Sequence, residues 1–198
     1  MLKFTTDIKE AGLIFEEYGY KLAAAPISFG KNFSFLNDVN HTFPAENLLP
    51  NMNIAITHIP NKTCALDVDH ESLSIPILKY LGIDLGNLIQ TTMSWRGRPN
   101  RCKLLFNSPN FNLDICSLRY EEKMVLEIKG AELYSETSKE NKYNYFEVLP
   151  PSIHGVTKER YEFITELVPR NNLPNLPDKL LEVYCNFKDF EKILLSKI

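Results

Sequence analysis

The 198-residue sequence lacks the features that mark membrane and exported proteins. No apolar run approaches the roughly 20 residues needed to span a bilayer. The N-terminal residues contain no apolar core long enough for a signal peptide. We therefore expect a cytoplasmic protein without a membrane partner. Its composition, with 44% hydrophobic and 24% charged residues, is that of an ordinary globular protein.

Cysteines are few and scattered. Cys64, Cys102, Cys116 and Cys185 form no CxxC pair, which argues against a zinc knuckle. This usage fits a reducing compartment. All four are predicted to be packed thiols.

An excess of positive charge is also missing, because the formal net charge is −3. Proteins that grip duplex DNA through many phosphates are usually strongly basic. Any contact with nucleic acid must therefore come from a local basic patch. One stretch qualifies, since Arg96, Arg98, Arg101 and Lys103 fall within eight residues with no acidic residue among them.

Hydrophobic periodicity predicts a mixed α/β (α+β) domain whose sheet is largely antiparallel in the second half. No internal repeat, low-complexity tract or linker divides the chain, so we expect one domain over residues 1–198, alone or as a fragment of a longer protein. Helices are expected at about 7–18, at 71–80 and from about 177 onward. Strands are expected at 20–27, 53–59, 64–68, 103–106, 113–118, 124–129 and 145–150. The turn residues 60–62 predict that the runs 53–59 and 64–68 form a β-hairpin or a close relative.

The sharpest local motif is the pair of acids Asp67 and Asp69. Residues two apart on a strand point to the same face, so both carboxylates project together. Two such carboxylates repel unless a cation lies between them. Oxygen ligands at this spacing suit Mg²⁺ or Mn²⁺, although a solvated strand end also explains a lone DxD. Because of the repulsion, replacing both acids with alanine is expected to stabilise the metal-free protein.

A third acid, Glu127, interrupts an apolar strand run at 124–129. It is either a solvent-facing residue on a half-exposed strand or a third carboxylate beside Asp67 and Asp69. In the second case it completes a site for two metal ions, which would activate a hydroxyl and neutralise a leaving pyrophosphate.

A proline-rich loop follows the strand expected at 145–150. Pro150 and Pro151 remove backbone donors where the strand ends and fix an exposed turn. Ser152 and His154 would then present a hydroxyl and an imidazole from a rigid loop. A lone loop histidine is usually a surface residue, but its place in this rigid loop favours a functional role enough that both interpretations stay open.

In combination, these motifs resemble the primase-polymerase branch of the archaeo-eukaryotic primases. The LDVD, GRPNRCKLLF, LEIKG and VLPPSIHG segments, with the trailing Tyr161, occur in that family's order, and the resemblance extends over about residues 11–181. It implies an N-terminal α/β unit packed on an RRM-like catalytic half. Relatives are commonly found in plasmids, phages and other mobile elements, often fused to a helicase.

The resemblance also implies a function: a DNA primase/polymerase that transfers nucleotides to a 3′-hydroxyl on a DNA template and releases pyrophosphate. The catalytic residues, which would bind two Mg²⁺ or Mn²⁺ ions, are Asp67, Asp69 and Glu127. The expected partners are a dNTP or NTP, single-stranded or primed template DNA, and a helicase in cis or in trans. The helicase would be a separate unit, since no GxxxxGK[ST] motif occurs in the sequence.

The remaining site residues follow the same resemblance. Nucleotide binding is expected from Arg101, Lys103, Ser152 and His154, and DNA binding from Arg96 and Arg98. One departure concerns the second family motif, which usually presents a histidine where this chain has Arg101-Cys102-Lys103. Either cation can hold a triphosphate by charge.

Two alternatives stay open at this point. Asp67, Glu127 and Lys129 also fit a metal-dependent nuclease of the E-x-K type, in which the lysine helps to activate water. In a polymerase, Lys129 would instead be auxiliary or merely solvated. The absent histidine also allows a non-catalytic single-strand DNA-binding replication module.

Overall fold

The computed structural model describes residues 4–27, 42–108, 115–130 and 146–198. Within these residues the strands form two sheets, and every pair of named strands is antiparallel. The smaller sheet has the order β1 (Leu22–Pro26), β2 (Met52–Thr57), β8 (Phe146–Val148). The larger sheet has the order β6 (Cys116–Tyr120), β7 (Lys123–Lys129), β3 (Thr63–Val68), β5 (Cys102–Asn107), β4 (Met93–Arg96), β9 (Glu162–Phe163). The predicted mixed α/β fold with a largely antiparallel sheet is confirmed.

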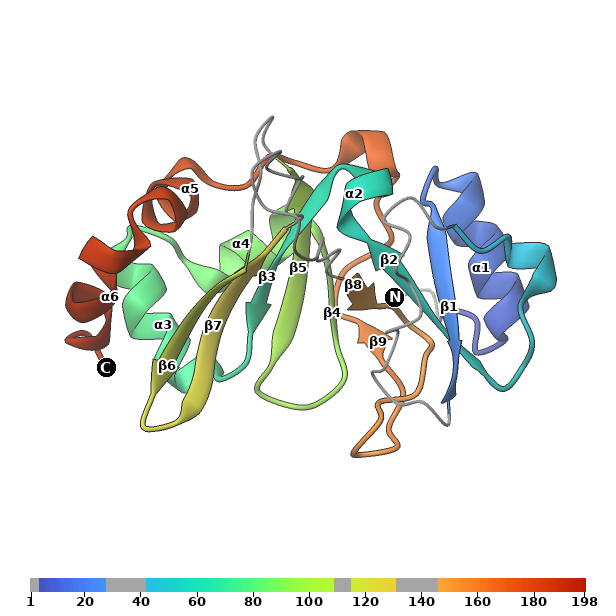
Figure 1. The fold of residues 1–198 in the computed structure, drawn as a ribbon, viewed down its shortest axis with the longest axis horizontal. Helices are drawn as coiled ribbons and strands as arrows, with labels where there is room; N and C mark the ends of the chain where they lie inside the picture. The colour runs from blue at the N-terminus through green and yellow to red at the C-terminus, as the bar shows by residue number, and fades with distance from the viewer. Residues whose placement is uncertain (1–3, 28–41, 109–114, 131–145) are drawn as a thin grey trace, which may run out of the picture.

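Helix α1 (Ile8–Glu17) covers the smaller sheet together with the short 3-10 helix η2 (Ala45–Asn47), as Figure 1 shows on the right. It begins where the sequence predicts, because the side chain of Asp7 accepts a hydrogen bond from the backbone N–H of Glu10 at 2.8 Å. It is followed by Gly19, whose φ of +84° is a left-handed conformation that glycine adopts without strain.

The chain passes directly from one sheet to the other between β2 and β3. The predicted hairpin is wrong: β2 pairs with β1 and β8, whereas β3 pairs with β5 and β7. Helix α2 (His58–Asn61) forms the connection, and the Asn61 side chain donates to the carbonyls of Lys21 and Thr57, each at 2.8 Å. Both strands are almost entirely buried, so the backbone groups on both edges of each strand need hydrogen-bond partners. Turn residues alone do not specify which strands provide them.

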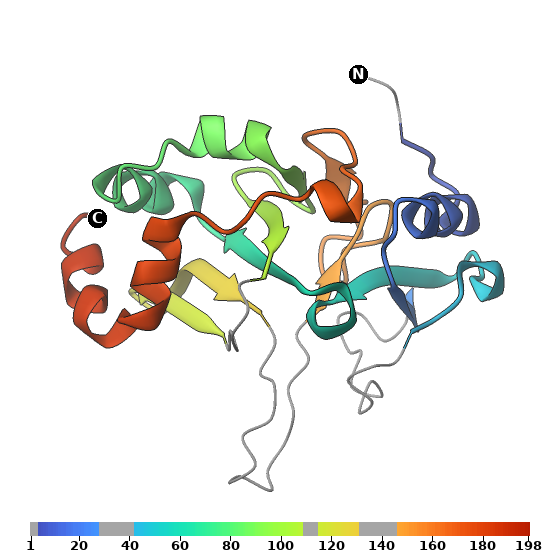
Figure 2. The same ribbon diagram turned by 90° about the horizontal axis from the view of Figure 1, so that it is seen from above.

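Four helices cover one face of the larger sheet and gather toward the left of Figure 2. They are α3 (Glu71–Tyr80), α4 (Leu85–Thr91), α5 (Asp178–Cys185) and α6 (Phe187–Leu195). Helix α3 has the predicted bounds, with Pro76 inside it. Helix α4 and strand β4 were not predicted, and the C-terminal helical pattern divides into two helices at Asn186.

The two faces of the larger sheet differ in chemistry. Leu66 and Val68 of β3 point toward the four helices and join their core. Alternation along the strand sends Ala65 and Asp67 to the opposite face. There Ala65 joins the core of the smaller sheet, and Trp95 donates from Nε1 to the carbonyl of Val148 at 2.8 Å, which ties the two sheets together. Asp67 therefore lies on a polar area of an otherwise apolar face.

The cysteine prediction is correct for three residues. Cys64, Cys102 and Cys116 are buried free thiols, whereas Cys185 is a free thiol on the exposed side of α5. No helix in the described part of the chain is both long and apolar enough to cross a bilayer.

Candidate functional site

Three neighbouring strands bring Asp67, Lys103 and Glu127 side by side. Asp67 lies on the central strand β3 and is paired in register with Lys103 of β5 and with Glu127 of β7. Directly opposed residues of antiparallel strands point to the same face. The three side chains therefore meet on the polar area of the larger sheet.

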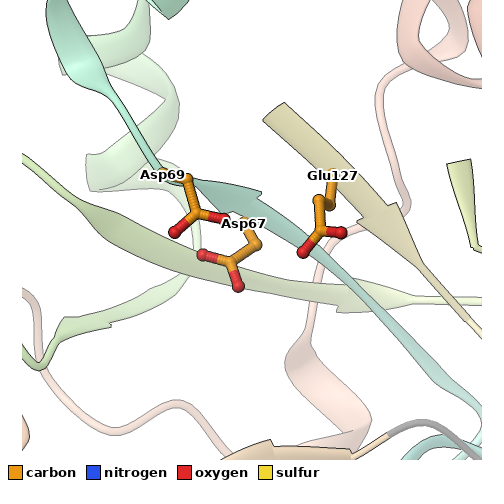
Figure 3. Close-up of side chains that lie close together, drawn as sticks. All are labelled: Asp67, Asp69 and Glu127. Atoms are coloured by element: carbon orange, nitrogen blue, oxygen red, sulfur yellow. The ribbon is translucent and has the colours of Figure 1, made fainter. Parts of the chain in front are cut away.

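Asp69 follows β3 and adds a third carboxylate. One oxygen from each of Asp67, Asp69 and Glu127 lies within 4.8 Å of the other two, and Figure 3 shows the carboxylates gathered together. Three carboxylates at this separation are a donor set that suits Mg²⁺ or Mn²⁺. Asp67 and Glu127 are 6% and 8% exposed, so the alternative of a solvent-facing Glu127 is wrong.

Each of the three acids also contacts a cationic side chain. Arg101 forms an ion pair with Asp69, and Lys103 with Asp67. The Nζ atom of Lys129 lies 2.7 Å from Oδ2 of Asp67 and 3.0 Å from Oε2 of Glu127. Because the Lys129 side chain is only 15% exposed, its interpretation as a solvated lysine is wrong.

A fourth acid, Glu147, approaches the same lysines from the smaller sheet. It belongs to β8, is 1% exposed, and accepts a hydrogen bond at Oε2 from Lys103 Nζ at 2.5 Å. Its Oε1 lies 3.7 Å from Lys129 Nζ. Sequence analysis did not single out Glu147, although it interrupts the apolar run 145–150 much as Glu127 interrupts 124–129. The same signal could have found it.

Electrostatics keep these buried groups charged. Burial alone would raise the pKa of Asp67, but the ammonium groups of Lys103 and Lys129 outweigh burial and hold that pKa well below its usual range. Burial likewise opposes charge on both lysines, yet the carboxylates of Asp67 and Glu147 raise their pKa values. The ammonium groups of Lys103 and Lys129 lower the pKa of Glu147, despite its burial.

Asp69 behaves differently from Asp67. Burial and then the negative charge of Asp67 raise the pKa of Asp69, and Arg101 only partly offsets them. Repulsion between the two acids therefore raises the pKa of Asp69, whereas two ammonium partners keep the pKa of Asp67 low. The expectation that removing both acids stabilises the protein overlooked these partners.

A pocket opens beside the acids. Its lining consists of Asp67, Asp69, Arg96, Gly97, Arg98, Arg101, Cys102, Lys103, His154 and Tyr161. All four basic residues of the stretch 96–103 thus face the same space as two of the acids. The Nε atom of Arg98 is buried and has no hydrogen-bond partner among the described residues. The pocket therefore combines acids whose arrangement fits a divalent cation with donors suited to phosphate oxygens.

Gly97 and Tyr161 form the wall of the pocket next to His154. A Cβ atom at position 97 would lie 2.6 Å from Cε1 of Tyr161, so only glycine lets the ring approach this closely. The rings of Tyr161 and His154 are 5.6 Å apart between centroids. Sequence analysis noted Tyr161 only as a trailing residue, and the glycine beside it was not recognised as a packing requirement.

The imidazole of His154 has a defined tautomer. Its Nδ1 accepts hydrogen bonds from the backbone N–H groups of Val156 and Thr157, at 3.3 Å and 3.1 Å. A neutral imidazole that accepts at Nδ1 carries its proton on Nε2. His154 lines the pocket, with its proton on Nε2.

Ser152 has a different place in the loop. It is fully buried, and its hydroxyl accepts from the backbone N–H of Ile54 at 2.9 Å and donates to the Ile54 carbonyl at 3.1 Å. The side-chain amide of Asn53 donates from Nδ2 to the Ile153 carbonyl and accepts at Oδ1 from the Ile153 N–H. These bonds hold the loop against β2. The Ser152 hydroxyl therefore contacts the backbone of β2 and does not line the pocket.

The family profile described as the N-terminal domain of bifunctional DNA primase/polymerase (Prim-Pol) matches residues 37–179. The chain belongs to this family. No curated protein matches the chain. The two-sheet architecture agrees with the primase-polymerase fold, and the matched region contains the three acids, the basic stretch and the loop of His154. Membership of the primase-polymerase family implies binding of nucleotides and of template DNA.

The geometry alone does not separate the polymerase from the E-x-K nuclease. Lys129 approaches both Asp67 and Glu127, as a nuclease lysine would. The primase-polymerase match covers the basic stretch and the proline loop as well as the three acids.

Proposed function

We propose that the domain is a DNA primase-polymerase, which joins a nucleotide to a 3′-hydroxyl on a DNA template and releases pyrophosphate. The observation that carries the proposal is the pocket in which Asp67 and Asp69, with Glu127 close by, face the cations of the stretch 96–103. A nucleoside triphosphate that arrives with divalent metal needs both kinds of partner.

In this proposal Asp67, Asp69 and Glu127 hold two Mg²⁺ or Mn²⁺ ions. Such ions, when bound, lower the pKa of the attacking hydroxyl and neutralise charge on the departing pyrophosphate. The chain's own contribution is to position the acids across two adjacent strands, which keeps their separation fixed by backbone hydrogen bonds.

Phosphate binding is assigned to Arg101, Lys103 and His154. The Lys103 ammonium stays charged inside the site, because neighbouring carboxylates raise its pKa. His154 lines the pocket from a loop that Asn53 and Ser152 hold against β2. Lys103 thus takes the place of the histidine that is usual in the family's second motif. Ser152 is assigned a supporting role in nucleotide binding, through the position of this loop.

Binding of template DNA is assigned to Arg96, at the end of β4, and to Arg98, in the following turn. Arg96 is exposed, and Arg98 extends into the pocket. Two arginines beside the site supply local positive charge on a chain whose net charge is −3. The resemblance to replication proteins of plasmids and phages supports a role in replication or priming of a mobile element, with strand opening by a helicase in another domain or protein.

The test is incorporation of a labelled dNTP or NTP in Mn²⁺ or Mg²⁺, on primed and unprimed templates. We expect wild-type protein to extend or prime, and the Asp67→Asn/Asp69→Asn variant to lose incorporation by at least about 100-fold, since metal-binding carboxylates act as a unit. A labelled DNA strand without nucleotides reports cleavage in parallel. Cleavage without incorporation would instead assign the site to a nuclease.

A further inference from the structure

Glu147 contacts Lys103 and Lys129, as the metal-binding acids do, but it does not belong to the group of those acids. The group of three carboxylates that fit a cation comprises Asp67, Asp69 and Glu127, all on the larger sheet or at its edge. Glu147 comes from the smaller sheet and contacts both lysines, Lys103 at 2.5 Å and Lys129 at 3.7 Å. Its carboxylate is 1% exposed, so it is not a solvated surface acid.

Lys103 has two counterions. Its Nζ contacts Oδ2 of Asp67 and Oε2 of Glu147, and its side chain is 13% exposed. Lys129 has three, since its Nζ also approaches Glu127. A buried ammonium without a counterion is costly, so both lysines must keep at least one carboxylate in every state of the site.

A cation in the metal site changes which carboxylates remain as counterions for the two lysines. Once Asp67 and Glu127 share their charge with a divalent cation, they become poor counterions for Lys103 and Lys129. Glu147 then remains as the carboxylate that still neutralises both ammonium groups. Without it, the lysines would have only the metal ligands to pair with and would compete with the cation for them.

We propose that Glu147 is a positioning residue, which draws Lys103 and Lys129 away from the metal ligands. Asp67 and Glu127 can then take a divalent cation while both ammonium groups stay at the site to meet the triphosphate. This inference rests on the proposed metal-dependent function, and it adds a counterion exchange between the two sheets.

The experiment measures Mn²⁺ binding by electron paramagnetic resonance, without nucleotide or DNA. The variants are Glu147→Gln, Lys103→Met and the two combined. Glu182→Gln is the matched control, because Glu182 forms an exposed ion pair with Lys179 at 2.7 Å on α5. Urea unfolding of each variant gives the folded fraction, to which the affinity is normalised.

We expect Glu147→Gln to weaken Mn²⁺ binding about tenfold, within the usual range of coupling between neighbouring sites. Lys103→Met should bind Mn²⁺ at least as tightly as wild type, because a competing ammonium is gone. The double variant should regain most of the loss. A purely structural Glu147 would lower stability and leave the normalised Mn²⁺ affinity unchanged, which would overturn the proposal.

A second comparison applies if Glu147→Gln does not fold. Lys103→Met leaves Glu147 paired with Lys129, and it must still bind Mn²⁺ at least as tightly as wild type. Weaker binding by Lys103→Met would refute the exchange. Failure of the proposed function gives a different result, in which the wild type binds Mn²⁺ and shows the expected variant pattern but incorporates no nucleotide.

Discussion

Lys129 Nζ lies 2.7 Å from Oδ2 of Asp67, although the two residues belong to different strands and are not register partners. The same ammonium lies 3.0 Å from Oε2 of Glu127. One lysine therefore joins the acids of β3 and β7. It acts as a counterion within the site, whichever reaction the site performs.

The first prediction compares Glu127 with Lys129. Glu127→Gln should abolish nucleotide incorporation, because a proposed metal ligand loses its charge. Lys129→Met should reduce incorporation by a smaller factor, about tenfold, because Asp67 and Glu127 lose a shared partner that holds them in place. Both variants should be assayed for incorporation and for DNA cleavage. Equal loss of a cleavage activity in both, with no incorporation by wild type, would favour the nuclease.

The second prediction separates the two aspartates by stability. Asp67→Asn should lower the free energy of unfolding by about 1–3 kcal/mol, because two buried ammonium groups lose a carboxylate. Asp69→Asn should change it by less than about 1 kcal/mol, because repulsion from Asp67 offsets the ion pair with Arg101. Urea unfolding in the absence of metal measures both. Equal effects would mean that the lysines do not rely on Asp67.

The third prediction concerns the arginines of the pocket. Arg101→Ala should raise the KM for the nucleotide roughly 10- to 100-fold, since a charge-assisted phosphate contact contributes about 1.5–3 kcal/mol. Arg98→Ala should weaken binding of template DNA and flatten its salt dependence. Arg119→Ala, at an exposed position on β6, is the control for the loss of one arginine. An unchanged KM in Arg101→Ala would mean that its only partner is Asp69.

The fourth prediction is a loss of stability in mild acid that originates at His58. This residue is fully buried after β2, with Nδ1 3.0 Å from Oγ1 of Thr63, and burial lowers its pKa to about 4. In the unfolded chain a histidine has a pKa of about 6.5. Between these values the unfolded chain binds a proton that the folded protein does not. Stability should therefore fall as the pH drops from about 6.5 to 4, by up to about 3 kcal/mol.

Urea unfolding between pH 7.5 and 4.5 measures this effect. His58→Gln should remove most of the pH dependence in this window, whereas His70→Gln, the control for losing a histidine, should retain it. If the His58 variant keeps the wild-type slope, the acid sensitivity comes from other groups.

The sequence predicted the acids of the site better than their surroundings. Asp67, Asp69 and Glu127 could be found because charged residues interrupt apolar strand runs, and a known family places acids there. Glu147 carries the same local signal, but its significance depends on contact with strands that precede it by many residues. The partners of β2 were missed for a similar reason, since the turn at 60–62 says where a strand ends and not which sheet comes next.

Helix α4 and strand β4 show a different limit. They are short, and Gly86 weakens the helical signal of the segment Leu85–Thr91. Leu85 and Leu88 nevertheless pack in the core under α3, so tertiary contacts form a helix that local propensity does not predict.

The ion pairs of the site also affect how substrates approach from a distance. Among the described side chains, four carboxylates are matched by three cations within direct contact, so the site without metal is almost neutral. A bare cluster of acids would repel an incoming triphosphate or DNA strand through a strong negative potential. Here the lysines and Arg101 offset that charge, and Arg96 and Arg98 add two cations to the lining of the pocket. The charge that an approaching polyanion meets at the pocket therefore differs from that of the protein as a whole, whose net charge is −3.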